Sequence, residues 1–133
     1  MCGIVGIASS KKIESRSWLE RGRDAIAHRG PDGAGIWWDE DGHVGLAHRR
    51  LSIIDLSSAG HQPMRYAASN CTLVFNGEIY NHHALREQLI TLGYTFNSTT
   101  DTEVILASYD QWGIDFLSHL KGMYAFALFD PKL

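Results

Sequence analysis

Short apolar runs separated by polar, glycine-containing breaks dominate the first third of the chain. Cys2 to Ala8 is rich in β-branched residues and glycine, which predicts a strand buried on both faces. Gly35 to Trp38 and Val44 to Ala47 are two further apolar runs, joined by Asp39-Glu40-Asp41-Gly42. Because Asp-Gly is a strong hairpin signal, these two runs predict an antiparallel pair of strands.

The second half of the chain holds two more runs of this kind. Thr72 to Phe75 predicts a strand that leads into the polar motif Asn76-Gly77-Glu78. Met123 to Phe129 is almost continuously apolar and predicts a buried strand. No apolar run follows it that would cover its edge, so we expect the chain to be a piece of a longer protein.

Helical periodicity marks three segments. Residues 15–27 carry apolar side chains at helical spacing and predict an amphipathic helix. Asn81 is expected to cap a second helix, which Gly93 ends. Thr100-Asp101-Thr102-Glu103 has the pattern of a capping box at the start of a third helix, and Gly113 ends it. Strands that cluster before two helices and a final strand predict an α+β fold, in which antiparallel sheets pack against helices.

Composition narrows the class of protein. The 133 residues suit one domain, and 44% apolar with 20% charged residues indicate a globular chain. The net charge of -3, without a basic run, argues against a nucleic-acid or anionic-membrane surface. No apolar segment reaches the ~20 residues of a membrane span, and no signal peptide is visible. We therefore expect a cytoplasmic protein whose two cysteines, Cys2 and Cys71, do not form a disulfide.

The position of Cys2 suggests chemistry at the chain terminus. A thiol needs a base at neutral pH, and a free α-amine beside it has the right strength. This arrangement requires removal of Met1, which precedes Cys2 in the sequence. The alternative is that Cys2 is a small hydrophobic residue in a strand, as expected for Cys71.

Three other positions have both a chemical and a structural interpretation. Asn76 and Gly77 form either a plain turn or a pair of donors for a developing oxyanion. Arg50 is either a solvated arginine or a bidentate ligand for a carboxylate. Asp101 either caps a helix or binds an ammonium group. The seven histidines have no metal-ligand spacing, so we expect no metal site.

Taken together, five ordered motifs resemble the class II glutamine amidotransferase domain, an N-terminal-nucleophile hydrolase, most closely that of glutamine-hydrolysing asparagine synthetases. The motifs are Met1-Cys2-Gly3-Ile4-Val5-Gly6, His28-Arg29-Gly30-Pro31-Asp32, Arg50-Leu51-Ser52-Ile53-Ile54-Asp55, Asn76-Gly77-Glu78-Ile79-Tyr80-Asn81 and Asp101-Thr102-Glu103. Gln62-Pro63 and Gly122-Met123-Tyr124-Ala125-Phe126 favour the asparagine synthetase type. The resemblance spans essentially the whole chain.

The resemblance implies a role for each matching residue. Cys2, freed of Met1, would attack the glutamine side-chain amide, with Asn76 and the Gly77 N–H as the oxyanion hole. Arg50 would hold the α-carboxylate of glutamine. The remaining expected residues are Glu78 and Asp101 for the ammonium group, the main chain of Leu51, Ser52, Ile53 and Ile54 for the pocket wall, and Arg29 and Gly30 for the shape of the site.

The resemblance also implies an architecture and partners. We expect a four-layer α-β-β-α sandwich over residues 1–133, an incomplete glutaminase domain with further strands beyond Leu133. An ATP-using synthetase domain, absent here, would receive the ammonia, and ATP and magnesium would bind only there. A homodimer remains an option. Two alternatives stay open: a catalytically idle binding or assembly module, and an amidotransferase that feeds a different acceptor or acts on another amide.

Overall fold

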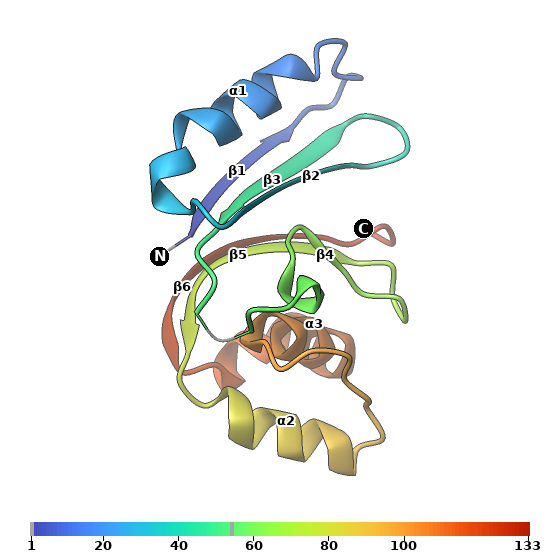
Figure 1. Ribbon diagram of the computed structural model, residues 1–133. Helices are drawn as coiled ribbons and strands as arrows, with labels where there is room; N and C mark the ends of the chain where they lie inside the picture. The colour runs from blue at the N-terminus through green and yellow to red at the C-terminus, as the bar shows by residue number, and fades with distance from the viewer. Residues whose placement is uncertain (1, 54) are drawn as a thin grey trace.

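In the computed structural model, which describes residues 2–53 and 55–133, two antiparallel sheets lie face to face between helices (Figure 1). The first sheet has the order β1-β3-β2 and the second the order β4-β5-β6. Helix α1 covers the outer face of the first sheet, and α2 and α3 cover the second (Figure 1). The elements are β1 (Gly3–Ala8), α1 (Ser17–Ala25), η1 (Ala27–Arg29), β2 (Gly33–Trp38), β3 (Val44–Arg50), η2 (Ser58–Gly60), β4 (Met64–Arg65), β5 (Thr72–Ile79), α2 (His82–Thr91), α3 (Asp101–Trp112), η3 (Gly113–His119) and β6 (Gly122–Phe129).

The predicted α-β-β-α sandwich is thus confirmed, and so is the hairpin of the first sheet. Gly42 takes a left-handed φ of 75° in the turn, and the Val44 N–H donates to the Asp39 side chain at 2.7 Å. The sheet differs from expectation at β1, which was predicted to be buried on both faces. Only Gly3 of β1 is fully buried. The prediction was wrong because β1 is an edge strand, paired on one side with β3.

The second sheet corrects a boundary that matters for the site. β5 does not end before Asn76-Gly77-Glu78 but runs through this motif to Ile79. Pairing with β6 along the whole strand, from Thr72↔Phe129 to Ile79↔Gly122, overrides the turn tendency of Asn-Gly. β6 itself was expected to be buried, yet it lies at the sheet edge with half-exposed and exposed residues.

The helices begin and end close to the expected residues. Thr100 caps α3, because its hydroxyl accepts the Glu103 N–H at 3.2 Å, and Gly113 ends the helix with a φ of 56°. Asn81 precedes α2 but makes no side-chain cap. Its amide instead donates to the His119 carbonyl at 2.9 Å and accepts the Lys121 N–H at 2.9 Å, which ties α2 to the start of β6.

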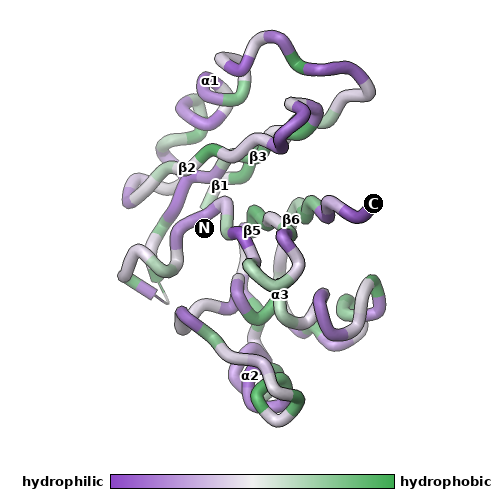
Figure 2. Tube along the Cα trace, turned by 90° about the vertical axis from the view of Figure 1, so that its right-hand side faces the viewer, coloured by the Kyte–Doolittle hydropathy of each residue, from purple (hydrophilic) through white to green (hydrophobic). Residues whose placement is uncertain are grey.

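The main hydrophobic core lies between the second sheet and its two helices. Leu73, Phe75 and Ile79 of β5 pack there against Leu89 and Ile105. Side chains alternate along a strand, so the intervening residues of β5 face the first sheet. Figure 2 shows hydrophobic positions along β5, β6 and α3. Burying each such side chain contributes about 1.5–3 kcal/mol, and this core fixes β5 and the start of α3 relative to each other.

Candidate active site

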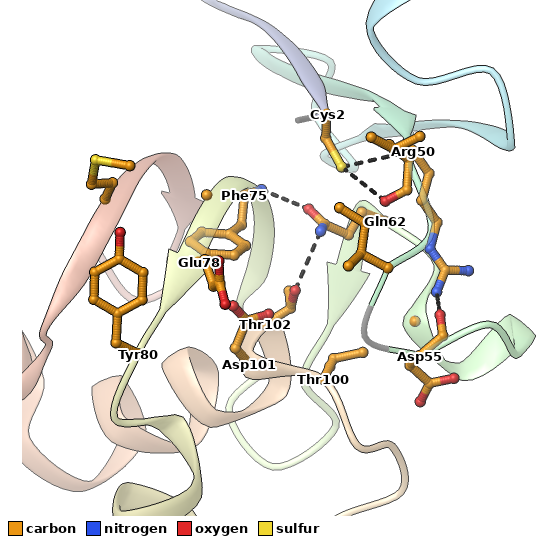
Figure 3. Close-up of a pocket in the computed structure, with 15 residues that line it drawn as sticks. Cys2, Arg50, Asp55, Gln62, Phe75, Glu78, Tyr80, Thr100, Asp101 and Thr102 are labelled. Atoms are coloured by element: carbon orange, nitrogen blue, oxygen red, sulfur yellow. Dashed lines mark hydrogen bonds between the residues drawn. The ribbon is translucent and has the colours of Figure 1, made fainter.

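A cleft opens at one end of the two sheets, with a volume of about 180 Å³ (Figure 3). It is smaller than the roughly 300–1,000 Å³ of sites for drug-sized ligands, so it suits a molecule of amino-acid size. The predicted site residues that line it are Cys2, Arg50, Leu51, Ile53, Gly77, Glu78 and Asp101. Arg29, Gly30, Ser52 and Asn76 are not among its lining residues, and Ile54 lies outside the described residues, as does Met1.

Cys2 lies directly before β1, where the strand pairs with the end of β3. Its sulfur accepts the Leu51 N–H at 3.3 Å and its thiol donates to the Leu51 carbonyl at 3.6 Å. The side chain is half-buried and reaches the cleft. The pairing of Gly3 with Arg49 holds the backbone next to Cys2, so the thiol has a fixed position and a donor for negative charge on sulfur.

Arg50, the last residue of β3, is 8% exposed and directs its guanidinium into the loop that follows. Nη1 donates to the Ser57 carbonyl at 2.8 Å, and Nη2 donates to the Asp55 carbonyl. These bonds use two of the five guanidinium N–H donors and leave others for a ligand. A Cβ at Gly60 would collide with Nη2 of Arg50, so this glycine makes room for the side chain.

Asp55 links that loop to the one before α3. Its carboxylate accepts the N–H and hydroxyl of Ser57, at 2.8 and 2.6 Å, and the N–H and hydroxyl of Thr99, both at 3.1 Å. These hydrogen bonds hold the pKa of Asp55 well below its usual value. The carboxylate therefore sets the path of the chain whose carbonyls hold Arg50.

Asp101, the first residue of α3, is 5% exposed. Its Oδ2 accepts the N–H of Ile79 at 3.1 Å, while the neighbouring Thr100 is the residue that caps the helix. Burial raises the pKa of Asp101, and the bond from Ile79 opposes that shift. The exposed Glu78 lines the same cleft, so the site has two carboxylates across from the Cys2 side (Figure 3).

Gly77 reaches the cleft, whereas its predicted partner Asn76 is not among the lining residues. A Cβ at Gly77 would collide with the backbone of Met123 and Tyr124, so only glycine fits here. The Oδ1 atom of Asn76 is buried and has no hydrogen-bond partner within the described part of the chain. The side chain of Asn76 thus keeps an unused acceptor.

Arg29 and Gly30 lie behind the end of β3 rather than in the cleft. A Cβ at Gly30 would come within 2.5–2.6 Å of the backbone of Arg49 and Arg50, so this loop touches β3 directly. Next along the chain, the Asp32 N–H donates to the Arg50 carbonyl at 3.0 Å, and the Asp32 carboxylate accepts the Ser52 N–H at 2.8 Å. The segment supports the backbone on both sides of Leu51.

Several residues at or beside the site had no predicted role, among them Gln62, Thr102 and His48. The Oε1 atom of Gln62 accepts the Phe75 N–H at 2.6 Å, and its Nε2 donates to the Thr102 hydroxyl at 3.3 Å (Figure 3). His48 of β3 donates from Nε2 to the Phe75 carbonyl at 3.1 Å. Burial lowers the pKa of His48 to about 4. For His48 the sequence held one signal, its place on the same side of a strand as other inward-facing residues. This position does not specify a hydrogen-bond partner.

Among residues 2–53 and 55–133, no group of three or more His, Cys, Asp or Glu residues is arranged to bind a metal ion. None of the helices in this described portion is long and apolar enough to cross a membrane.

Comparisons with known proteins show the family of this chain. Residues 1–133 match the family model described as "Glutamine amidotransferase domain". The chain is 40% identical to glutamine-hydrolyzing asparagine synthetase 3 of Bacillus subtilis, covering 99% of the chain and 22% of that protein. It is 42% identical to synthetase 1 of the same organism, with 99% and 21% covered. The chain therefore spans about a fifth of the length of these relatives.

One solved structure and a further sequence relative also match the chain. The glutamine phosphoribosylpyrophosphate amidotransferase of B. subtilis superimposes with a TM-score of 0.83 at 25% identity, over 97% of this chain and 35% of that one. Amidase chry2 of Gibberella zeae is 45% identical over 86% of the chain and 17% of its own length. With the family model matched from end to end, the chain belongs to the glutamine amidotransferase domain family, of the type found in glutamine-hydrolysing asparagine synthetases.

Proposed function

We propose that this domain hydrolyses the side-chain amide of glutamine to glutamate and ammonia through a thioester on Cys2. The observation that carries the proposal is the shared cleft: the Cys2 thiol, the Gly77 backbone, Arg50 and Asp101 all line it. A nucleophile, a backbone N–H for an oxyanion and charges of both signs are the groups that an amide of an amino acid requires.

Charge complementarity orients the substrate. The remaining N–H donors of Arg50 hold the α-carboxylate of glutamine, and Asp101 and Glu78 hold its ammonium group. The segment that carries Leu51 and Ile53, which both line the cleft, forms the wall beside Cys2. Each end of the amino acid is thereby fixed, and the side-chain amide extends toward the sulfur, which converts attack into an effectively unimolecular step.

The reaction then proceeds in two steps, formation of the thioester on Cys2 and its hydrolysis by water. With Met1 removed, the α-amine of Cys2 takes the thiol proton as the sulfur bonds to the amide carbon, and the oxygen becomes an oxyanion held by Gly77 N–H and the Asn76 amide. The oxyanion collapses, the C–N bond breaks and ammonia leaves with the transferred proton. Water, deprotonated by the same amine, attacks the thioester carbon, and glutamate leaves as the thiol is restored.

The ammonia would supply a synthetase domain of the asparagine synthetase type. Support comes from the two B. subtilis relatives, whose names state glutamine hydrolysis and asparagine synthesis and whose lengths exceed this chain several-fold. ATP and magnesium would be used in that domain, and this one would need no cofactor.

Glutamate release from glutamine by the Met1-free protein tests the proposal. We expect Cys2→Ala to lower the rate by orders of magnitude, because nucleophile removal leaves only binding and the oxyanion donors. Cys71→Ala is the matched control, since Cys71 is buried in the core away from the cleft. Intact mass shows whether Met1 is present. Equal turnover by the Met1-free parent and its Cys2→Ala variant would refute the proposal.

A further inference from the structure

The edge of β5 that faces away from β6 is only partly paired. β4 is two residues long and pairs with Leu73 and Thr72 alone, so β5 continues past it to Ile79 without a strand beside it in the described structure. Unpaired peptide groups at such an edge must find other partners or a ligand.

On this edge, side chains are the hydrogen-bond partners of the backbone N–H and C=O of Phe75. Its N–H donates to Gln62 Oε1 at 2.6 Å, and its carbonyl accepts from His48 Nε2 at 3.1 Å. Gln62 and His48 come from two different segments, the loop before β4 and the strand β3 of the opposite sheet. The Phe75 peptide is therefore held from both the other sheet and the loop.

The same is true at the end of the strand. Ile79 donates its N–H to Asp101 Oδ2 at 3.1 Å, and its carbonyl lies 2.8 Å from Nδ1 of His82. In an antiparallel ladder, successive residues point their N–H and C=O groups alternately to one neighbour and to the other. Phe75 and Ile79 point away from β6, so Gly77, midway between them, also presents its N–H away from β6 and into the cleft.

We propose that His48 and Gln62 are positioning residues that hold the Phe75 peptide so that the N–H of Gly77 faces the reacting carbonyl. This inference rests on the proposed function. The contacts of His48 and Gln62 with Phe75, called the clamp below, lie two residues before Gly77. An error of ~1 Å in the position of a catalytic donor can cost ~100-fold in rate.

The chemistry of each clamp residue suits this task. A carbonyl only accepts hydrogen bonds, so the imidazole of His48 carries its proton on Nε2, and Nδ1 is a buried acceptor without a partner in the described structure. Gln62 is itself held by the Thr102 hydroxyl. Thr102 follows Asp101 in α3, so one chain of hydrogen bonds joins the helix start, the loop and β5.

The test compares variants that remove a clamp contact with variants that keep it. His48→Phe keeps a ring but loses the donor, and His48→Gln keeps a donor. Gln62→Met loses both polar atoms, and Gln62→Glu keeps the acceptor for Phe75. We expect His48→Phe and Gln62→Met to lower kcat for glutamine about 10–100-fold with little change in KM, and each conservative variant to recover most of the loss.

A second readout isolates the oxyanion. Glutamate γ-semialdehyde adds to the Cys2 thiol and places a tetrahedral oxygen where the oxyanion forms. Its inhibition constant should rise in parallel with the loss of kcat, while the affinity of glutamine for the same variants in a Cys2→Ala background stays unchanged. Unchanged kcat in His48→Phe and Gln62→Met overturns the inference, as does a kcat loss without weaker inhibition by the aldehyde.

A milder pair serves if those variants fail to fold. Thr102→Val removes the hydroxyl that holds Gln62 and leaves both contacts with Phe75, and Thr102→Ser retains the hydroxyl. We expect kcat to fall about 3–10-fold in Thr102→Val, the equivalent of one lost hydrogen bond. In Thr102→Ser, kcat should stay near the wild-type value. Equal kcat in the two variants overturns the inference. An inactive Met1-free parent would instead refute the proposed function.

Discussion

Asp101 Oδ2 accepts the backbone N–H of Ile79 at 3.1 Å, which joins the first residue of α3 to the last residue of β5. The carboxylate has a structural contact and a cleft position at the same time, because one oxygen serves Ile79 and the residue also lines the cleft. The helix cap considered for Asp101 is made by Thr100 instead, and the contact that Asp101 makes with Ile79 is compatible with ammonium binding.

Asp101→Asn separates the charge of this side chain from its contact. The amide oxygen still accepts the Ile79 N–H, so the fold should persist. Losing a charged partner for the substrate ammonium costs ~1.5–3 kcal/mol, so we expect KM for glutamine to rise about 10–100-fold, with a much smaller change in kcat. Steady-state kinetics measure both. Asp115→Asn, on the exposed surface of η3, is the control, and an unchanged KM in Asp101→Asn would contradict the assignment.

Asp55→Ala should affect substrate binding through Arg50. The variant loses the bonds to Ser57 and Thr99, and the carbonyls of residues 55 and 57 that hold the guanidinium are no longer anchored. We expect KM for glutamine to rise roughly 3–10-fold, the equivalent of about one lost hydrogen bond. Asp41→Ala, an exposed aspartate in the hairpin turn, should behave as wild type. Equal KM values in the two variants would argue against this role for Asp55.

Gly30, in the loop after η1, and Gly33, the first residue of β2, give a matched test of the contact behind Arg50. Gly30→Ala places a methyl group within 2.5–2.6 Å of the Arg49 and Arg50 backbone, whereas Gly33→Ala meets only the Arg50 side chain, at 3.5 Å. We expect Gly30→Ala to lower the free energy of unfolding by ~1–3 kcal/mol and Gly33→Ala by ~0.5 kcal/mol or less. Urea denaturation measures both. Similar losses of unfolding free energy in the two variants would show that the loop shifts to accommodate the methyl group at Gly30.

His48 should make the stability of the domain depend on pH. Burial lowers its pKa from 6.5 to about 4, with smaller contributions from the charges of Arg50 and His61. Below pH 6.5 the unfolded chain binds a proton that the folded chain rejects until about pH 4. The stabilisation is complete above pH 6.5 and is lost as the pH falls through this window, by up to ~3 kcal/mol.

Urea unfolding of the parent and of His48→Gln at pH 7.5 and 4.5 checks this. The parent should lose more stability than the variant on acidification, because glutamine does not titrate. The same loss in both proteins would show that another group is responsible.

Features of the fold that depend on short-range interactions could be predicted from the sequence, and features that depend on distant segments could not. The 39–42 hairpin, the Thr100 cap and the glycine end of α3 depend on neighbours within a few residues, and each is confirmed. The continuation of β5 through Asn76-Gly77 depends on pairing with β6, which no local signal encodes. Asn81 likewise uses its amide for a distant segment instead of a cap.

The candidate site divides in the same way. Ordered motifs placed Cys2, Arg50, Gly77 and Asp101 at one site, and all four line the cleft. Their catalytic and binding roles stay predictions, as does that of Asn76. The clamp formed by His48 and Gln62 was missed, because a histidine in a strand and a glutamine before proline carry no information about a shared partner on a third segment.

The shortness of β4 has a consequence for how substrate binds. The carboxamide of glutamine has the same atoms as a peptide group, and its oxygen would accept the Gly77 N–H just as the carbonyl of a neighbouring strand does. A bound glutamine would thus add one peptide-like group beside β5, at the position opposite Gly77 that β4 would reach only with four more residues. The domain would therefore bind the side-chain amide of glutamine with the same kind of hydrogen bond that joins neighbouring strands of a sheet.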